Sequence, residues 1–401
     1  MRLHRNLVFA VIQALDLIYN EKEYADKVVQ KTLKLDKRWG ARDRKFIAET
    51  IYDMVRWKRL YNEIAGSKGH YPRDNLFKNF AVWATLKGIT LPDWKYFEGT
   101  PTRRIKGRFD ELQSDRKYRE SIPDWMDEVG SAELGKKWDI ELVELNKQAK
   151  VILRTNSLKT TRKELQNLLR VEEIETEEIA NNPDALMLVE RKNVFLTDVF
   201  KKGLFEVQDA SSQLVAPFLD VKPGQKVIDA CAGAGGKTLH LASLMENKGQ
   251  IIAMDIYAHK LAELKKRAKR DGAHNIETRP IEGTKSIKKF KGKADRVLID
   301  APCSGIGVLK RNPDSKWKLN ADFLDRIRKT QAEILDQYAS MVKPGGKMVY
   351  ATCSILPSEN ENQVKAFLKN HTDFRLTKDK KVSPAASGFD GFYMALLEKN
   401  A

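Results

Sequence analysis

Two cysteines stand where buried strands are predicted to end. Cys303 lies in the segment DAPCSG at residues 300–305, and Cys353 lies in ATCS at 351–354. A thiolate is a strong nucleophile when nearby cations or a helix N-terminus lower its pKa. Packing is the ordinary alternative, since free cysteines often lie in cores. Two cysteines at strand ends, in a chain with only three, favour covalent catalysis.

A glycine-rich segment follows an earlier predicted strand and could hold a ligand. Glycines let the backbone approach a ligand, and the next helix offers free N–H groups. The segment ends like a P-loop, but Cys231 stands where that motif needs a glycine, which disfavours an NTPase. A tight strand-to-helix turn is the ordinary alternative. Its candidate ligand-binding residues are Cys231, Ala232, Gly233, Ala234, Gly235, Gly236 and Lys237.

An acid follows the next predicted strand. Asp255 comes directly after the apolar run 251–254. An acid at the end of a second parallel strand can accept hydrogen bonds from ribose hydroxyls. The alternative is a cap for the helix expected near Tyr257. The position after the glycine-rich segment favours the ribose contact.

The elements that must position these residues alternate between short apolar runs and amphipathic stretches. Such alternation predicts a doubly wound, mostly parallel sheet that binds ligands at the carboxyl ends of its strands. We therefore expect an α/β Rossmann-like domain over residues 206–401. The expected strands include 227–228, 251–254, 296–299 and 347–351, and the expected helices include 239–245, 260–270 and 323–341.

The first part of the chain has helical periodicity. Apolar residues recur at three- and four-residue steps over 7–18 and 46–55, which predicts an all-α bundle over residues 1–140. Its basic loop 37–45 contains Trp39. That mixture fits RNA contact and a plain helix–helix connection equally well.

A small α/β subdomain is expected over residues 141–205, between the helical bundle and the larger sheet. A strand is predicted at 151–156, a helix at 163–169 and further strand candidates at 185–196.

The composition limits the function classes. No apolar run reaches the ~18–20 residues of a membrane span, and the first residues lack a secretory signal pattern. We expect a soluble, cytoplasmic protein that does not bind membranes. The three cysteines include no C-x-x-C pair, so neither a metal site nor a disulfide framework is expected.

The formal net charge of +17 favours a nucleic-acid partner modestly over a merely soluble basic protein. The basic residues cluster at 37–45, 265–270, 285–293 and 310–318.

These segments together resemble the RsmB/Nol1/Nop2/Sun family of RNA cytosine-5 methyltransferases. The resemblance runs from about Gln208 to the C-terminus. More weakly, residues 42–44 and 52–57 resemble the NusB-type domain of the bacterial 16S rRNA members. The matching segments are QDASS at 208–212, CAGAGGKT at 231–238, DAPCSG at 300–305, RNPD at 311–314, KW at 316–317 and YATCS at 350–354.

The resemblance implies a Rossmann-like methyltransferase core, with S-adenosyl-L-methionine as cofactor and RNA, 16S rRNA in particular, as partner. No obligate protein partner is expected. It implies that residues 231–237 form the cofactor loop, that Asp255 binds the ribose, and that Glu282 contacts the adenine side. An aspartate is usual at the last position, and Gly233-Ala234 stand where the family more often has Ala-Pro.

The resemblance also implies the catalytic roles. Cys353 would be the nucleophile, Cys303 would assist product release, and Asp300 would be the active-site acid that holds the N3 and N4 edge of the base. A thiolate that adds to C6 of cytosine makes C5 nucleophilic enough to accept a methyl group, which yields 5-methylcytosine.

Two alternatives stay open at this point. Some DNA cytosine-5 methyltransferases use the Pro-Cys cysteine, so Cys303 would attack if this chain followed them. A non-catalytic RNA-binding ribosome assembly factor is the rival function, and the presence of Cys353, Cys303 and Asp300 argues for an enzyme.

Overall fold

A computed structural model describes residues 3–67 and 69–401, and the chain forms two compact units. The first comprises Met1–Lys147 and Leu309–Ala321, and the second comprises Gln148–Val308 and Asp322–Ala401. This division differs from the expected boundaries. The helical part extends past residue 140, and a short segment from within the expected domain 206–401 belongs to it.

The first unit is built from helices, as predicted. The periodic stretches 7–18 and 46–55 lie in α1 and α3, and their apolar faces form the core, where Val11 and Ile51 are fully buried. The helices are α1 (Arg5–Tyr19), α2 (Ala25–Thr32), α3 (Ala41–Arg56), α4 (Lys58–Ala65), α5 (Arg73–Leu86), η1 (Lys95–Phe97), α6 (Thr102–Leu112), α7 (Arg116–Arg119), α8 (Asp124–Leu134), α9 (Lys137–Leu145) and α17 (Ser315–Lys318).

The segment Leu309–Ala321 joins this unit through buried polar contacts. Lys316 is fully buried, and its Nζ donates to the carbonyl oxygens of Glu120 at 3.2 Å and Ser121 at 3.1 Å. Trp317 donates from Nε1 to the carbonyl oxygen of Val55 at 2.7 Å. These contacts explain why the segment groups with the helices rather than with the sheet that precedes it in sequence.

The second unit begins with a four-stranded antiparallel sheet in the order β2-β3-β1-β4. The strand predicted at 151–156 and the helix predicted at 163–169 are confirmed. The region 185–196 is only partly a strand, because Val194–Leu196 forms a 3-10 helix. The elements are β1 (Ile152–Thr155), α10 (Arg162–Val171), β2 (Thr176–Glu178), β3 (Ala185–Leu188), η2 (Val194–Leu196), α11 (Asp198–Lys201) and β4 (Phe205–Val207).

The larger sheet has seven strands in the order β10-β11-β9-β8-β5-β6-β7. The pairs β5–β6, β6–β7, β5–β8 and β8–β9 are parallel, whereas β11 pairs antiparallel with both β9 and β10. The predicted mostly parallel sheet is confirmed. The strands are β5 (Lys226–Asp229), β6 (Gln250–Asp255), β7 (Ile276–Pro280), β8 (Ala294–Asp300), β9 (Val342–Thr352), β10 (Phe374–Val382) and β11 (Phe392–Lys399).

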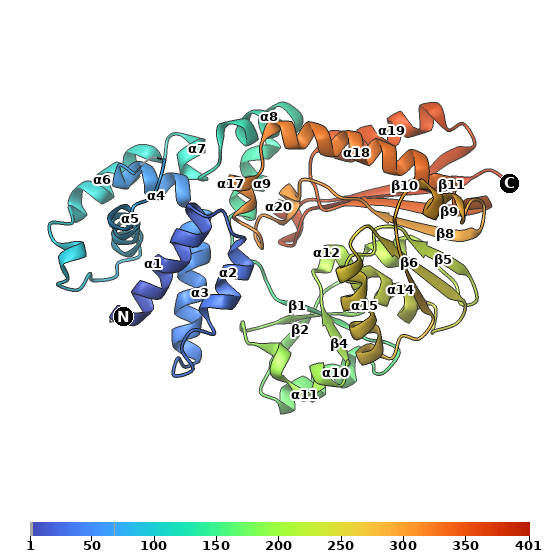
Figure 1. Ribbon diagram of the computed structural model, residues 1–401, viewed down its shortest axis with the longest axis horizontal. Helices are drawn as coiled ribbons and strands as arrows, with labels where there is room; N and C mark the ends of the chain where they lie inside the picture. The colour runs from blue at the N-terminus through green and yellow to red at the C-terminus, as the bar shows by residue number, and fades with distance from the viewer. Residues whose placement is uncertain (1–2, 68) are drawn as a thin grey trace. The chain divides into compact units, whose positions relative to one another are not determined.

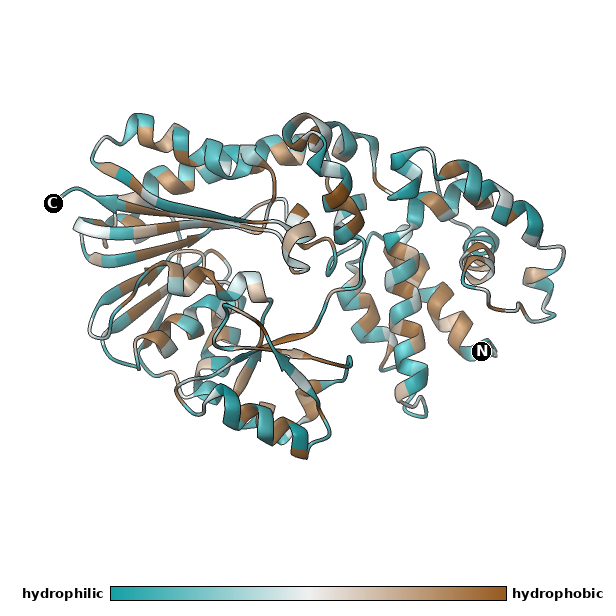
Figure 2. Cartoon of the chain, turned by 180° about the vertical axis from the view of Figure 1, so that it is seen from behind, coloured by the Kyte–Doolittle hydropathy of each residue, from teal (hydrophilic) through white to brown (hydrophobic). Residues whose placement is uncertain are grey.

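Helices cover both faces of this sheet because its central strands are apolar on both sides. Val227 packs in one core with α14 and α15, whereas its neighbour Ile228 packs in the other with α18 and α19. Figure 1 shows α18 and α19 on one face and α14 and α15 on the other, and Figure 2 shows the helices banded with apolar and polar residues. The remaining helices are α12 (Ala210–Gln213), α13 (Val215–Phe218), α14 (Gly236–Leu244), α15 (Ala258–Asp271), α16 (Thr284–Lys288), η3 (Ile306–Val308), α18 (Ala321–Ala339), η4 (Pro357–Glu359), α19 (Glu361–Asn370) and α20 (Pro384–Ser387).

Candidate active site

Three acids end neighbouring strands of the larger sheet. Asp229 ends β5, Asp255 ends β6 and Asp300 ends β8. Strand β5 lies between β6 and β8, so the order of the strands reverses between β5 and β8. Open α/β sheets bind their ligands at the carboxyl edge beside such a reversal. The acids therefore lie where this fold places a ligand.

The glycine-rich loop turns sharply from β5 into α14. Gly235 has a φ of +89°, and a Cβ atom there would lie 2.5 Å from Cγ of Leu264, so only glycine fits. Two arginines from other parts of the chain donate hydrogen bonds to the backbone of this loop. Arg154 donates to the carbonyl oxygen of Gly236 at 2.5 Å, and Arg267 donates to that of Ala234 at 2.7 Å.

A cavity of about 300 Å³ opens beside this loop. Of the residues predicted to bind the cofactor, Gly235, Asp255 and Glu282 do not line this cavity. The other predicted cofactor residues line it, and so does Asp300. The loop therefore faces a space that could hold a ligand. The lining residues are Val207, Gln208, Ser212, Asp229, Cys231, Ala232, Gly233, Ala234, Gly236, Lys237, Arg267 and Asp300.

Asp229 contributes an unusual carboxyl group to this cavity. Its Oδ2 accepts a hydrogen bond from the Thr238 hydroxyl at 2.7 Å, whereas its buried Oδ1 has no partner among the residues that the structure describes. Burial, with a further contribution from Asp300, raises the pKa of Asp229 to about 7. A cationic group bound in the cavity would stabilise the ionised form of this carboxyl.

Lys237 and Asp300 form an ion pair at the edge of the cavity, with Nζ 2.6 Å from Oδ2. The Lys237 Nζ also lies 5.2 Å from the ring centroid of Phe392. Burial acts to lower the pKa of Lys237, but Asp300, with smaller contributions from Cys353 and Asp229, raises it above its ordinary value. The positively charged side chain of Lys237 therefore interacts electrostatically with Cys353.

The two strand-end cysteines meet. Their Sγ atoms lie 3.2 Å apart, and both residues are half-buried. The hydrogen bond to Cys353 and burial raise the pKa of Cys303 well above its ordinary value. Cys353 is also held through its backbone, because Gly307 donates its N–H to the Cys353 carbonyl oxygen at 3.1 Å. A Cβ atom at Gly307 would come within 2.8 Å of that oxygen, so glycine is required there.

Asp255 is tied to the loop, and its neighbours are exposed. Its Oδ2 accepts from the Gly233 N–H, and its Oδ1 accepts from the Tyr257 N–H, both at 2.8 Å. The predicted ribose contact thus competes with local hydrogen bonds. Ile256 is 62% exposed beside it, and Tyr257 is 49% exposed.

Glu282 does not line the cavity. It is exposed in the turn after β7, where its backbone N–H donates to the Ser286 hydroxyl at 3.3 Å. The cofactor contact suggested by the family pattern at this position stays a prediction. The third cysteine, Cys231, lines the cavity, and burial raises the pKa of its thiol well above the ordinary value.

Sequence reasoning missed several residues at the site. Arg154 comes from the small sheet and Arg267 from α15, so their distance in sequence hid their contacts with the glycine-rich loop. Gln208 stands in the QDASS segment, and its amide accepts a hydrogen bond from Arg154. That segment was a usable signal, whereas nothing local marked the two arginines.

The four basic runs differ in how far their side chains are exposed and in the contacts that they make. Trp39 in the run 37–45 is buried in the helical core, which supports the plain helix–helix connection over RNA stacking. Lys316 in the run 310–318 is fully buried, and Arg267 in the run 265–270 pairs with Glu206. The run 265–270 also contains exposed cations, Lys265, Lys266 and Lys269, so a role in RNA binding stays a prediction for it.

In the run 285–293 every lysine is exposed. Its lysines lie in α16 and the following turn, and no ion pair is found for them among the described residues. They are Lys285, Lys288, Lys289, Lys291 and Lys293.

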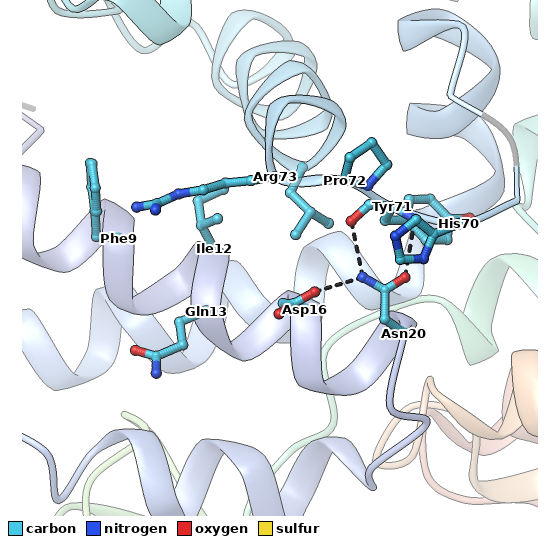
Figure 3. Close-up of a pocket in the computed structure, with 10 residues that line it drawn as sticks. Phe9, Ile12, Gln13, Asp16, Asn20, His70, Tyr71, Pro72 and Arg73 are labelled. Carbon is cyan, nitrogen blue, oxygen red and sulfur yellow. Dashed lines mark hydrogen bonds between the residues drawn. The ribbon is translucent and has the colours of Figure 1, made fainter.

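The helical unit has a cavity of its own, of about 530 Å³. Figure 3 shows Arg73 extending toward Phe9 and the Asn20 amide bonded to Asp16 and Tyr71. Among its polar lining groups, Asn20 is bonded both to Asp16 and to the backbone of Tyr71. Over the described residues, no helix is long and apolar enough to cross a membrane, and no cluster of three or more His, Cys, Asp or Glu side chains could hold a metal ion.

The mostly parallel seven-stranded sheet, the glycine-rich loop and the strand-end acids are features of a Rossmann-like methyltransferase fold. The family model of 16S rRNA methyltransferase RsmB/F matches residues 216–398, and a model of the RsmF/B-like ferredoxin-like domain matches residues 122–195. The chain belongs to this RsmB/F family.

Relatives and solved structures agree with this assignment. The probable ribosomal RNA small subunit methyltransferase B of Bacillus subtilis is 35% identical over 296 residues, covering 69% of this chain and 65% of that protein. Its Synechocystis counterpart is 35% identical over 299 residues, covering 70% of this chain and 67% of that protein. The crystal structure of PH0851 has a TM-score of 0.86 and 26% identity over all of both chains. A methyltransferase homolog protein from Pyrococcus horikoshii has a TM-score of 0.64 and 26% identity, covering 71% of this chain and 98% of that one.

Proposed function

We propose that this chain transfers a methyl group from S-adenosyl-L-methionine to C5 of a cytosine in RNA, specifically 16S rRNA, with Cys353 as the nucleophile. One observation carries the proposal. Two thiols lie 3.2 Å apart, and the Lys237–Asp300 ion pair, whose lysine interacts electrostatically with Cys353, lines the neighbouring cavity. The family relatives named as rRNA small subunit methyltransferases support the substrate.

The cavity fits the proposed cofactor. S-adenosylmethionine carries a cationic ammonium and a cationic sulfonium group, and two acids, Asp229 and Asp300, line the cavity. The unpartnered Oδ1 of Asp229 offers an acceptor for the ammonium group. Asp255 would accept from the ribose hydroxyls, and the exposed side chain of Ile256 offers an apolar surface to the adenine.

The bound cofactor supplies an electrophilic methyl group. The thiolate of Cys353 would add to C6 of the cytosine, and the electron pair of the C5–C6 double bond would move to C5. C5 would then bond to the methyl carbon as the bond between that carbon and the sulfonium sulfur of the donor breaks, which leaves a neutral thioether. A base removes the C5 proton, the electron pair returns to the ring, and the C6–S bond breaks to release the thiolate. A single difficult substitution is thus divided into easier steps.

The two thiols are not equivalent. Because the pKa of Cys303 is raised well above its ordinary value, Cys303 stays protonated and can donate its S–H to the sulfur of Cys353. The interaction with Cys353 contributes, after that with Asp300, to raising the pKa of Lys237. This asymmetry supports Cys353 as the nucleophile and Cys303 as the residue that assists release.

Asp300 would orient the base. Its carboxylate accepts from Lys237 at 2.6 Å and is still partly exposed, with 30% of its side-chain surface accessible. A carboxylate accepts several hydrogen bonds, so Asp300 can also take one from the N4 amino group of cytosine.

The test compares two substitutions with radiolabelled S-adenosylmethionine and 16S rRNA from cells that lack the protein. Cys353→Ala should lower methyl transfer by at least ~10³-fold while cofactor binding stays near normal. Cys303→Ala should accumulate a covalent RNA–protein adduct that resists denaturing electrophoresis. Turnover retained in Cys353→Ala would contradict the nucleophile assignment, and bisulfite sequencing of the product identifies the modified base.

A further inference from the structure

Each of the two cysteines is followed by a serine, and both serines bind the same buried carboxylate. The Ser304 hydroxyl donates to Glu359 Oε2 at 2.6 Å, and the Ser354 hydroxyl donates to the same oxygen at 2.5 Å. Glu359 and Ser354 are fully buried, and Ser304 is 6% exposed. One side chain therefore contacts both loops that carry the thiols.

The second oxygen of Glu359 is also engaged. Oε1 accepts from the Ser304 backbone N–H at 2.8 Å and from the Gln331 amide at 3.1 Å. Gln331 in α18 also donates to the Pro302 carbonyl oxygen at 2.9 Å, directly before Cys303. Four donors thus satisfy the carboxylate, as a buried charge requires.

The residue after Glu359 completes the connection. The Asn360 amide donates to the Ser354 carbonyl oxygen at 2.9 Å, and its Oδ1 accepts from the Thr352 hydroxyl at 2.5 Å. The Tyr350 hydroxyl donates to the Glu359 carbonyl oxygen at 2.7 Å. The backbone on both sides of Cys353 is therefore tied to the turn at 359–360.

We propose that Glu359 is the positioning residue that sets the separation of the Cys303 and Cys353 thiols. It contacts neither sulfur by a hydrogen bond among the contacts described; it acts through Ser304 and Ser354. The inference rests on the proposed function, because the thiol separation matters for catalysis only if the two cysteines act together.

Glu359 also acts through its charge. It contributes to raising the pKa of Cys303, after the larger effects of the hydrogen bond to Cys353 and of burial. Removal of this charge should make Cys303 easier to ionise. Position and charge can be separated experimentally, because aspartate keeps the charge but is one methylene shorter.

A neutral amide cannot accept all four hydrogen bonds that this carboxylate accepts. Glu359→Gln supplies one acceptor oxygen and one NH₂ group, whereas the site presents four donors. In one orientation the NH₂ group faces two donors, the Ser304 backbone N–H and the Gln331 amide; in the other it faces the two serine hydroxyls, which would have to turn from donors into acceptors. The substitution preserves the side chain's size, so it tests the hydrogen bonds with little change in packing.

The experiment measures three quantities in Glu359→Gln and Glu359→Asp: methyl transfer at varied RNA concentration, cofactor affinity, and iodoacetamide alkylation of each cysteine against pH, followed by peptide mass spectrometry. Glu333→Gln, an exposed glutamate on α18, is the matched control. Circular dichroism and thermal unfolding verify that each variant is folded.

In Glu359→Gln we expect kcat to fall on the order of 10- to 100-fold with cofactor affinity within about threefold. Cys303 should be alkylated several-fold faster at mildly alkaline pH. In Glu359→Asp, kcat should fall similarly while Cys303 alkylation stays near the wild-type rate. Unchanged kcat together with unchanged alkylation profiles in the folded Gln variant would overturn the proposal.

Two further variants keep the proposal testable if Glu359→Gln does not fold. Ser304→Ala and Ser354→Ala each remove one hydrogen bond to the carboxylate, and each should lower kcat severalfold. Normal kcat in both would overturn the positioning role. The alkylation profiles do not depend on methyl transfer, so they test the role of Glu359 even if the wild-type protein proves inactive on rRNA. Inactivity of the wild type would contradict the proposed function and not the role of Glu359.

Discussion

Lys237 and Asp300 meet at 2.6 Å although 63 residues separate them in the chain. The lysine comes from the first turn of α14 and the acid from the end of β8. The pair places a positive charge in the environment of Cys353 and leaves part of the Asp300 carboxylate exposed. One ion pair thus connects the glycine-rich loop to the end of β8.

Cofactor affinity should depend on pH through Asp229. Its pKa is raised to about 7, and a cationic ligand in the cavity favours its ionised form. Binding should therefore strengthen as pH rises through 7, by up to roughly tenfold per pH unit below that value. Calorimetric titration with S-adenosylmethionine at several pH values measures this. Asp229→Asn should flatten the profile, and a slope retained in that variant would contradict the assignment.

Gly235→Ala should destabilise the second unit. The substitution forces an alanine into a φ of +89° and brings its Cβ to 2.5 Å from Leu264. We expect a loss of about 2–4 kcal/mol in the free energy of unfolding, measured by urea denaturation followed by far-ultraviolet circular dichroism. Gly224→Ala is the matched control, because its φ of +88° carries the same backbone strain with no atom within 4 Å. Equal losses in the two variants would exclude the Leu264 clash.

Lys316→Met should destabilise the helical unit. Several oxygen acceptors, including the Glu120 and Ser121 carbonyls and Asn146 Oδ1, would lose a donor in the core. We expect a loss of about 2–4 kcal/mol. All seven tryptophans lie in this unit, so tryptophan fluorescence follows its unfolding selectively. The exposed Lys34→Met serves as the control and should change stability little.

Lys316 also predicts a pH effect. Burial, with repulsion from Arg56, lowers the pKa of Lys316 well below its ordinary value of 10.5. The unfolded chain therefore binds more protons than the folded one between the lowered pKa and 10.5, and the free energy of unfolding rises with pH in that window. Lys316→Met should lose this rise, and fluorescence-monitored denaturation at several alkaline pH values measures it. An identical rise in both proteins would assign it to other groups.

The exposed lysines in α16 and directly after it should contribute to RNA binding. Lys288→Ala and Lys289→Ala together should weaken binding and reduce the slope of log affinity against log salt by about 1–2. Filter binding to 16S rRNA at varied salt measures this. The buried Lys310 is not a suitable comparison, because it is paired with Glu144, so Lys34→Ala is the control. An unchanged slope in the double variant would place the RNA elsewhere.

Much of the fold could be predicted from the sequence because hydrophobic periodicity determines it. The apolar runs ending at Asp255 and Asp300 gave central strands at the expected places. Strand β10 was missed because its side chains are mostly exposed and charged, as suits an edge strand. Strand β11 is buried and apolar, so its run could have been recognised.

The site was harder to predict where contacts are distant in sequence. The cysteines, Asp300 and the glycine-rich loop stand at strand ends, where the periodicity locates them. Glu359 and Arg154 act through partners elsewhere in the fold, and no local pattern reveals such partners. Net charge alone does not show which cations face solvent, because Arg267 and Lys316 make internal contacts.

Residues Leu309–Ala321 belong to the helical unit although they lie late in the sequence. This has a consequence for folding during synthesis on the ribosome. The helices up to residue 147 emerge early, yet the lysine and tryptophan that fill their core, Lys316 and Trp317, are translated much later. The helical unit can reach its final packing only after most of the sheet-forming chain has been made. Maturation of both units is thereby coupled to the same late stage of translation, and a nascent chain stalled before residue 309 would carry an unfinished N-terminal core.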